Sequence, residues 1–376
     1  MPEDKELLFE GLSLLIKPAS ADCNLACQYC FYMPKQQLYP GITRMNAETL
    51  ERMIAQYMDM AGPVATLAWQ GGEPTLMGLD FYKTAVALEQ QYKKDGQQVN
   101  NAFQTNGILL DDDWAEFFAE NNFLIGISMD GRPRFHDIYR KDRGGNPTHD
   151  RVLRAVRLLQ RHGVEFNILT VVNDVNAKKP EALFNYFFDM GIRYMQFIPC
   201  LETDEHGDIA PFSVSKDDYG EFLCRMFDKW YNMGQPECYI RDFDELMIYY
   251  VTGRHPSCTC SPFCNSTVVV EYNGDIYPCD FFVEPGWHLG NISDKPLKEL
   301  LLSDKYEAFR NGKQPMADEC QNCEYLSMCW GGCRKFYWSE GGIDQHRTYY
   351  CDAYKRFYKY SQSRFERLAA RWKEAR

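Results

Sequence analysis

The 376-residue sequence lacks any apolar run that approaches the roughly 18 residues needed for a membrane-spanning helix. Basic residues are also in deficit, because 41 Lys and Arg face 53 Asp and Glu and leave a net charge of −12. This balance argues against a nucleic-acid partner, since phosphate binding relies on clustered Lys and Arg. The amino terminus is polar and acidic and shows no signal-peptide pattern, so we expect a cytoplasmic protein with no membrane partner.

Disulfide bonds are a further expected absence, although cysteine itself is abundant at fifteen residues. In a chain without an export signal, this many cysteines favour metal or redox use over a disulfide framework. Eleven of them belong to spaced groups. Four fall outside, and we expect most of these to be buried apolar thiols: Cys200, Cys224, Cys238 and Cys260.

The first cysteine group is a C-x₃-C-x₂-C loop formed by Cys23, Cys27 and Cys30, which follows the apolar run 12–16. Three thiolates on one short loop can hold three irons of a four-iron cubane, whereas iron–sulfur clusters normally take four cysteines. The open iron suggests chemistry on a bound small molecule. A zinc knuckle or structural thiols are the alternative, but zinc knuckles usually close at four ligands.

The second cysteine group is an array in the last third of the chain. Eight thiolates suit two four-cysteine clusters, and two structural zinc sites are the alternative. Cys260 lies between Cys258 and Cys264, so spacing alone leaves open whether Cys258 or Cys260 is a ligand. The eight candidates are Cys258, Cys264, Cys279, Cys320, Cys323, Cys329, Cys333 and Cys351.

Short β-rich runs alternate with amphipathic stretches over the first 200 residues. This alternation predicts parallel βαβ units with right-handed crossovers, and six strands rather than eight suggest an open, partial (β/α)6 barrel. The predicted strands are 12–17, 66–70, 100–104, 124–128, 165–171 and 193–198, and the predicted helices are 47–60, 79–92, 112–120, 149–161 and 180–190.

The composition changes twice along the chain and predicts three parts. Residues 1–213 form the α/β barrel, and residues 214–253 form a helical linker region with helices at 216–232 and 242–252. Residues 254–376 form a cysteine-rich domain that contains a hairpin turning at Asn273 and Gly274 and a terminal helix from about 349.

Four motifs follow the carboxyl ends of predicted strands, at residues 23–30, 71–74, 104–107 and 128–131. Ligand sites in such folds gather at that edge of the sheet, so the motifs should converge on one cavity. Gly71 and Gly72 would let a ligand approach the backbone closely. The planar guanidinium of Arg140 could pair with a carboxylate, although a surface arginine is the alternative.

These motifs resemble the radical S-adenosylmethionine (SAM) superfamily, in which SAM chelates the open iron. Residues 71–74 resemble its GGEP segment, and the cysteine array resembles the SPASM extension that houses two auxiliary clusters. The motifs C-N-L-x-C-x-Y-C-F-Y, Leu-Ile-Lys-Pro from Leu14 and Tyr-Pro-Cys-Asp from Tyr277 most closely resemble anaerobic sulfatase-maturating enzymes. The likeness covers about residues 11 to 355.

The resemblance implies SAM and three [4Fe–4S] clusters as cofactors. It places the first cluster on Cys23, Cys27 and Cys30. For the other ligands it implies a nearer auxiliary cluster on Cys258, Cys264, Cys279 and Cys333, a farther one on Cys320, Cys323, Cys329 and Cys351, and SAM contacts from Tyr29, Gly72, Ser128, Arg140 and Leu201.

The activity implied by the resemblance is oxidation of a cysteine or serine to Cα-formylglycine in an unfolded sulfatase, at a C-x-P-x-R or S-x-P-x-R motif. A 5′-deoxyadenosyl radical would take a hydrogen from Cβ, Asp280 would remove the side-chain proton, and the nearer auxiliary cluster would accept the electron. Tyr32 would orient the substrate or assist proton movement, and both Tyr32 and Gln104 should face the cavity. The family suggests flavodoxin or ferredoxin as the electron donor.

Three other functions are compatible with parts of the pattern. Another SPASM-type enzyme could form thioethers or crosslinks in a peptide, but many of these carry an amino-terminal extension, and here the first strand begins within about eleven residues. A multi-cluster electron carrier would not turn over SAM. A zinc-binding interaction module would be colourless.

Overall fold

The computed structural model describes residues 9, 11–264, 266–338 and 347–375, which fold into two compact units. Neither unit is a continuous stretch of sequence. The predicted domain boundaries at residues 213 and 253 coincide with no boundary of these units, and the three-part division remains a prediction. In the described part of the chain, no helix is both long and apolar enough to cross a membrane. The first unit comprises Met1–Ser128, Arg140–Phe166 and Asn265–Arg310, and the second comprises Met129–Tyr139, Asn167–Cys264 and Asn311–Arg376.

Four parallel strands form the centre of the first unit. They are β1 (Ser13–Lys17), β2 (Val64–Trp69), β3 (Gln98–Thr105) and β4 (Leu124–Ser128), paired in that order. Most of their apolar side chains are buried, as expected for parallel strands covered on both faces, and Val64 and Leu124, the first residues of β2 and β4, are exposed. The four predicted strands in this part of the chain are therefore confirmed.

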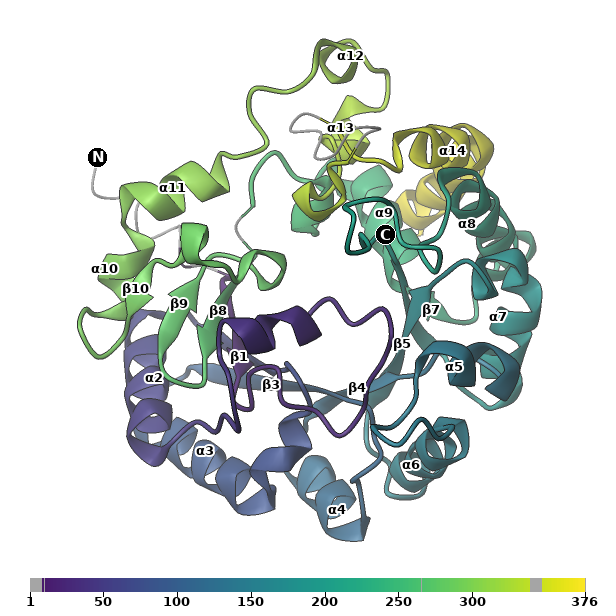
Figure 1. Ribbon diagram of the computed structural model, residues 1–376. Helices are drawn as coiled ribbons and strands as arrows, with labels where there is room; N and C mark the ends of the chain where they lie inside the picture. The colour runs from purple at the N-terminus through teal and green to yellow at the C-terminus, as the bar shows by residue number, and fades with distance from the viewer. Residues whose placement is uncertain (1–8, 10, 265, 339–346, 376) are drawn as a thin grey trace. The chain divides into compact units, whose positions relative to one another are not determined.

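Helices cover one side of these strands. Figure 1 shows α2, α3 and α4 on that side, and the purple segment that follows β1 on the other. The side chain of Asn46 caps α2 by accepting a hydrogen bond from the backbone N–H of Thr49 at 2.8 Å. All four helices have the predicted bounds: α2 (Ala47–Met60), α3 (Leu79–Tyr92), α4 (Asp112–Glu120) and α6 (His149–Arg161).

A late segment of the chain completes the first unit. β8 (Thr267–Glu271) pairs in parallel with β1, and β9 (Asp275–Tyr277) returns antiparallel to β8 through the predicted hairpin, where Gly274 has φ +89°. This pairing with β1 was not predicted. The remaining elements of this unit are β10 (Gly290–Asn291), α10 (Leu297–Leu301), α11 (Asp304–Arg310), and the 3-10 helices η1 (Met33–Gln37), η2 (Pro74–Met77), η6 (Asp280–Phe282) and η7 (Pro285–Trp287).

The second unit has three parallel strands, β5 (Phe166–Val172), β6 (Tyr194–Pro199) and β7 (Tyr239–Ile240). The first two were predicted. Its helices are α5 (Pro133–Tyr139), α7 (Pro180–Asp189), α8 (Lys216–Tyr231), α9 (Arg241–Thr252), α12 (Asp318–Gln321), α13 (Leu326–Cys329) and α14 (Cys351–Glu374), with 3-10 helices η3 (Asn176–Lys178), η4 (Asn232–Gly234), η5 (Cys258–Cys260) and η8 (Arg334–Phe336).

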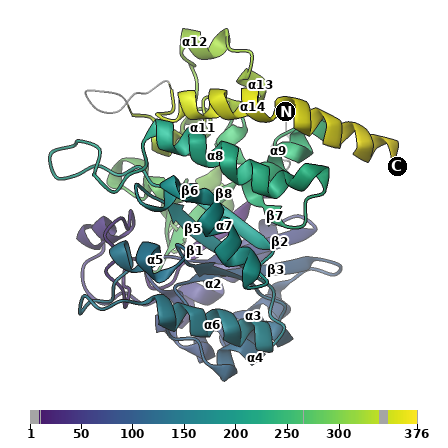
Figure 2. The ribbon, with the colours of Figure 1, turned by 90° about the vertical axis from the view of Figure 1, so that its right-hand side faces the viewer.

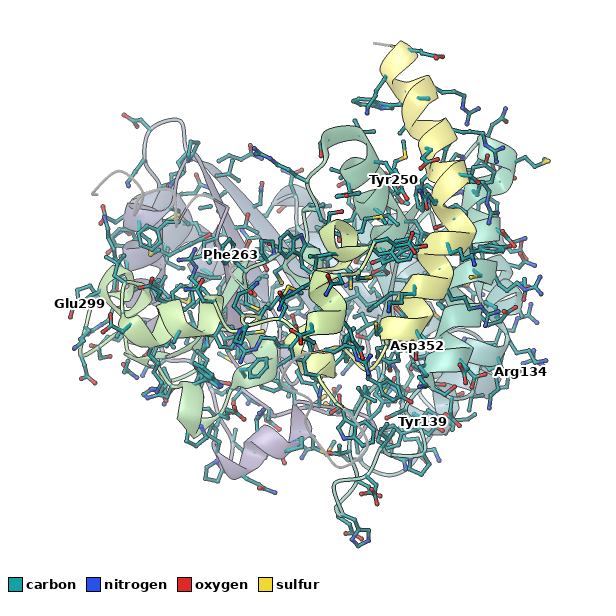
Figure 3. The ribbon with its side chains drawn as sticks, turned by 90° about the horizontal axis from the view of Figure 1, so that it is seen from above. Arg134, Tyr139, Tyr250, Phe263, Glu299 and Asp352 are labelled. Atoms are coloured by element: carbon teal, nitrogen blue, oxygen red, sulfur yellow. The ribbon has the colours of Figure 1, made fainter. Side chains whose placement is uncertain are left out.

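The terminal helix α14 packs within the second unit along α8 and α9, and Figure 2 shows it beside α8. Its Phe365 is buried between Phe227 of α8, at a ring-centroid distance of 4.9 Å, and Tyr250 of α9, at 5.2 Å. Figure 3 shows Tyr250 next to this helix. Aromatic packing therefore fixes the helix whose first residue, Cys351, belongs to the cysteine array.

Candidate active site and cysteine clusters

The three cysteines of the first loop line one cavity of about 170 Å³ in the first unit, together with Tyr32 and Gly72. The loop is held by local hydrogen bonds, including Cys30 N to Cys27 O at 3.1 Å. Among the described residues that line this cavity there is no fourth cysteine. The donor set thus fits a four-iron cluster with one iron left open for another ligand.

The raised pKa of Cys23 agrees with a site in which the positive charge of bound iron ionises the thiol. Burial raises the pKa of Cys23, and the carboxyl of Glu73 raises it further, so a metal is needed to favour the thiolate. Across the described residues, no three His, Cys, Asp or Glu side chains converge closely enough to hold one metal ion. The thiolates of a cubane bind separate irons and do not need that spacing.

The glycine pair after β2 permits two close approaches inside the first unit. A Cβ on Gly72, which has φ +49°, would lie 1.9 Å from the carbonyl oxygen of Asp22, next to the cysteine loop. A Cβ on Gly71, which has φ +99°, would lie 2.3 Å from Cδ of Lys17. Only glycine fits at either position. The absence of a side chain at Gly71 and Gly72 therefore allows the cysteine loop and Lys17 to pack against the end of β2.

Glu73 joins the ends of β2 and β3 beneath this loop. It is fully buried, and its carboxylate accepts hydrogen bonds from Thr105 Oγ1 at 2.7 Å and from Asn106 N at 2.8 Å. Its own N–H donates to the carbonyl of Asp22 at 2.8 Å. Burial raises the pKa of Glu73, while the hydrogen bonds oppose that effect. Asn106 in turn donates to the Oδ1 of Asn24 at 2.7 Å, which fixes the start of the cysteine loop.

The predicted SAM-contacting residues fall into both units. Arg140 is only 8% exposed, not on the surface, and its guanidinium lies 5.4 Å from the ring centroid of Tyr29. The chain after Arg140 pairs with the cysteine loop, since Ala26 N donates to Lys141 O at 2.9 Å. Ser128 ends β4 and is buried in the first unit, whereas Leu201 is buried in the second.

Asp280, the proposed base, follows β9 and is held by two side chains of the first unit. It forms an ion pair with Lys17, whose side chain is fully buried, and its Oδ2 accepts a hydrogen bond from Gln70 Nε2 at 3.2 Å. Sequence reasoning missed both partners. The available signal was a lysine that ends an otherwise apolar strand, because lysine is almost never fully buried unless it is paired.

Tyr32 connects this ion pair to the cysteine cavity. The Nζ of Lys17 lies 4.3 Å from the ring centroid of Tyr32, and the Tyr32 hydroxyl donates to the buried carboxyl of Glu271 on β8. Burial and the nearby carboxyls of Glu271 and Asp280 raise the pKa of Tyr32, so it remains a phenol that donates. Lys17, Tyr32, Gln70, Glu271 and Asp280 together are called the Lys17 network below.

The second unit brings together the four cysteines predicted for the farther cluster. They line one cavity, next to Tyr354 and Tyr358 of α14. Lys355 and Arg347 also line it and lower the pKa of two of the thiols, although burial is the larger effect and raises it. The four are Cys320, Cys323, Cys329 and Cys351.

The cysteines predicted for the nearer cluster are divided between the units. Cys279 lies in the first unit and the other three in the second, and Figure 3 labels Phe263, which directly precedes Cys264. Burial raises the pKa of Cys333 to about 12, and the thiols of Cys258 and Cys264 contribute. Cys260 instead raises the pKa of Cys329. The assignment of Cys258 and not Cys260 to the nearer set stays a prediction.

Two protein-family models match the chain. The radical SAM superfamily matches residues 18–187, and an iron–sulfur cluster-binding domain named SPASM matches residues 260–324. Because the two matches cover the cysteine loop and much of the array, they coincide with the two sites described above.

Curated relatives and a solved structure match nearly the full chain. A cysteine-type anaerobic sulfatase-maturating enzyme of Clostridium perfringens is 38% identical over 95% of this chain and 98% of its own length. A serine-type anaerobic sulfatase-maturating enzyme of Bacteroides thetaiotaomicron is 37% identical over 93% and 89%. A structure of native anSMEcpe with bound AdoMet and Cp18Cys peptide superposes with a TM-score of 0.89 at 38% identity, covering 96% of this chain and 99% of that one.

Proposed function

Because the chain belongs to the family of anaerobic sulfatase-maturating enzymes, we propose that it oxidises a cysteine or serine side chain in a sulfatase peptide to Cα-formylglycine. The protein is a radical SAM oxidoreductase of α/β fold with a SPASM extension. Its cofactors are SAM and iron–sulfur clusters, three [4Fe–4S] clusters in this family. When bound, these groups supply the radical that removes a hydrogen atom from the substrate Cβ and the acceptor for the surplus electron.

The position of Asp280 carries this proposal. Its carboxylate joins the Lys17 network, which reaches the cavity of the three cysteines through Tyr32. A base that takes the S–H or O–H proton must be fixed in place before the substrate arrives. Lys17 pairs with one carboxylate oxygen of Asp280 and Gln70 donates to the other, so Asp280 meets this need.

We assign the remaining roles residue by residue. Tyr32 orients the substrate or assists proton movement, and its position beside both Lys17 and the cavity supports this assignment. Cys23, Cys27 and Cys30 hold the first cluster. The proposed SAM contacts are Tyr29, Gly72, Ser128, Arg140 and Leu201, the proposed nearer ligands are Cys258, Cys264, Cys279 and Cys333, and the proposed farther ligands are Cys320, Cys323, Cys329 and Cys351.

The test is to incubate the anaerobically reconstituted enzyme, SAM and a reductant with peptides that contain a C-x-P-x-R or S-x-P-x-R core. Mass spectrometry should detect the mass change for formylglycine in at least one peptide. Asp280→Asn should still release 5′-deoxyadenosine but form product at least a hundredfold more slowly, the order of magnitude typical of a lost general base. Full product yield from Asp280→Asn would remove its role as the base, and the absence of product from wild type would refute the proposed function.

The partners follow from the same chemistry. We propose an unfolded sulfatase polypeptide as the substrate and a flavodoxin or ferredoxin as the electron donor, both acting in the cytoplasm. Peptide bound to the anSMEcpe structure supports a polypeptide substrate.

A further inference from the structure

Lys313 is a buried lysine of the second unit that lies among the cysteines of the array. Only 1% of the residue is exposed, and its Nζ donates to three backbone carbonyls: Cys258 O at 2.9 Å, Thr259 O at 3.0 Å and Ser261 O at 2.7 Å. Three acceptors at these distances require three N–H protons, which only the ammonium form carries. Lys313 therefore brings a full positive charge into the cysteine loop.

Among the residues that the structure describes, no ion pair neutralises the charge of Lys313. No described residue places a carboxylate within ion-pair distance of the Lys313 ammonium, whereas Lys17 pairs with Asp280 and Lys335 pairs with Glu202 at 2.8 Å. Carbonyl dipoles solvate an ammonium without cancelling its charge. A lysine buried in this way is costly unless another negative group compensates it.

The charge of Lys313 acts on cysteine thiols of both predicted auxiliary sets. Its charge lowers the pKa of Cys264 and of Cys333, predicted ligands of the nearer cluster, and the pKa of Cys329, a predicted ligand of the farther one, each against a larger opposite effect of burial. It also acts on Cys260. His255 adds no positive charge, because burial and Lys313 together lower its pKa to about 4. Arg334 also acts on Cys264, so Lys313 is one of two positive charges near that thiol.

We propose that Lys313 is a positioning residue that fixes the loop of Cys258 and raises the reduction potential of the nearer auxiliary cluster. An iron–sulfur cluster on thiolates gains negative charge when it is reduced, and its potential depends on the charges and hydrogen bonds around it. A buried ammonium stabilises the reduced form more than the oxidised form. Lys313 acts on this cluster through its ligand loop, whose carbonyls it binds directly. This inference rests on the proposed presence of clusters on these cysteines.

Redox titration of the full-length, anaerobically reconstituted protein tests the inference. Cys23→Ala, Cys27→Ala and Cys30→Ala together remove the signal of the first cluster, so electron paramagnetic resonance reports the auxiliary clusters alone. Lys313→Gln removes the charge but keeps N–H donors, and Lys313→Arg keeps the charge. Lys359→Gln makes the same chemical change at an exposed position of α14 and is the matched control.

Lys313→Gln should lower the reduction equilibrium constant of the nearer cluster about tenfold, a shift of about 59 mV to more negative potential for one electron. The potentials of Lys313→Arg and Lys359→Gln should match those of the parent protein, which carries only the three alanine substitutions at Cys23, Cys27 and Cys30. Equal potentials in Lys313→Gln and the parent would overturn the inference.

Two further outcomes separate the possible causes. If Lys313→Gln loses auxiliary iron, the reduction potential of Lys313→Arg becomes the test. A more negative potential in that variant, which keeps the charge, would show that the positive charge does not set the potential. The potentials do not depend on product formation. A wild-type enzyme that forms no formylglycine therefore refutes the proposed function alone, and unshifted potentials beside normal product refute this inference alone.

Discussion

At the scale of single residues, the protein uses buried charges in two different ways. Lys17 is neutralised by a carboxylate, while Lys313 is solvated by carbonyls and keeps its charge. The cysteine motif could be found from its local spacing, and Asp280 was named from the family resemblance of its motif. Lys17 and Glu271 end apolar strands, and although a lysine at such a position signals a buried pair, only the tertiary structure reveals the partner.

A double-mutant cycle tests the ion pair of the Lys17 network. Lys17→Met leaves Asp280 without its counter-ion, and Asp280→Asn leaves a buried ammonium unpaired, so each should destabilise the folded protein by about 3–5 kcal/mol. The double variant should recover much of this loss, because it removes both charges. Thermal unfolding of the four reconstituted proteins measures the coupling, and simple additivity of the two losses would contradict the pairing.

At the scale of elements, periodicity predicted the strands and helices well, but it did not predict which strands pair with one another. The predicted bounds of α2 and α3 match because capping residues and turns delimit them locally. The parallel pairing of β8 with β1 joins residues about 250 positions apart, and no local pattern encodes it. That pairing nevertheless decides where Asp280 lies.

Gly72→Ala tests the close approach of β2 to the cysteine loop. Positive φ alone should cost the folded state about 1–2 kcal/mol, and the new Cβ would also meet the Asp22 carbonyl. The matched control is Gly96→Ala, where φ is +76° and nothing lies within 4 Å of the added Cβ. Only Gly72→Ala should lose the iron of the first cluster, measured by iron content and electron paramagnetic resonance. Normal iron in this variant would show that the approach tolerates a side chain.

The buried face of α3 gives a pH-dependent prediction. Burial raises the pKa of Glu89 to about 7, although its Oε2 accepts a hydrogen bond from Asn101 at 2.8 Å. Because the folded-state pKa exceeds the unfolded one, stability is highest below the unfolded value and falls as the pH rises toward about 7. Glu89→Gln removes this loss, which is at most about 3 kcal/mol.

The measurement is the gain in Tm of Glu89→Gln over wild type, which should be larger at about pH 8 than at about pH 5.5. Glu116→Gln, at an exposed position of α4, is the control and should show no such trend. An equal gain at both pH values would contradict the raised pKa.

At the scale of the whole molecule, the resemblance of the cysteine loop, the array and their neighbouring motifs to a known family implied the family and the cofactors, and the comparisons confirm both. The two compact units could not be predicted, because each combines three separated stretches. Cys279 shows the difficulty, since its sequence neighbours in the array belong to the other unit. Spacing along the chain groups ligands by motif and does not reveal which unit supplies them.

Metal content is the prediction at this scale. The reconstituted wild-type protein should hold about twelve irons, four for each of three clusters. Replacing Cys23, Cys27 and Cys30 with alanine should leave about eight irons and abolish 5′-deoxyadenosine formation. A wild-type content of about four irons would refute the two auxiliary clusters, and continued SAM cleavage by the triple variant would place the initiating site elsewhere.

The insertion of β8 beside β1 has a consequence for biosynthesis. A nascent chain emerges from the ribosome amino terminus first, so β1 is made long before its neighbour Thr267–Glu271 is translated. Until then Lys17 has no Asp280 to pair with, and the backbone groups along one edge of β1 remain available for incorrect strand pairing. Fragments that stop short of β9 should therefore depend on chaperones, and assembly of the first unit must finish after translation has passed Asp280.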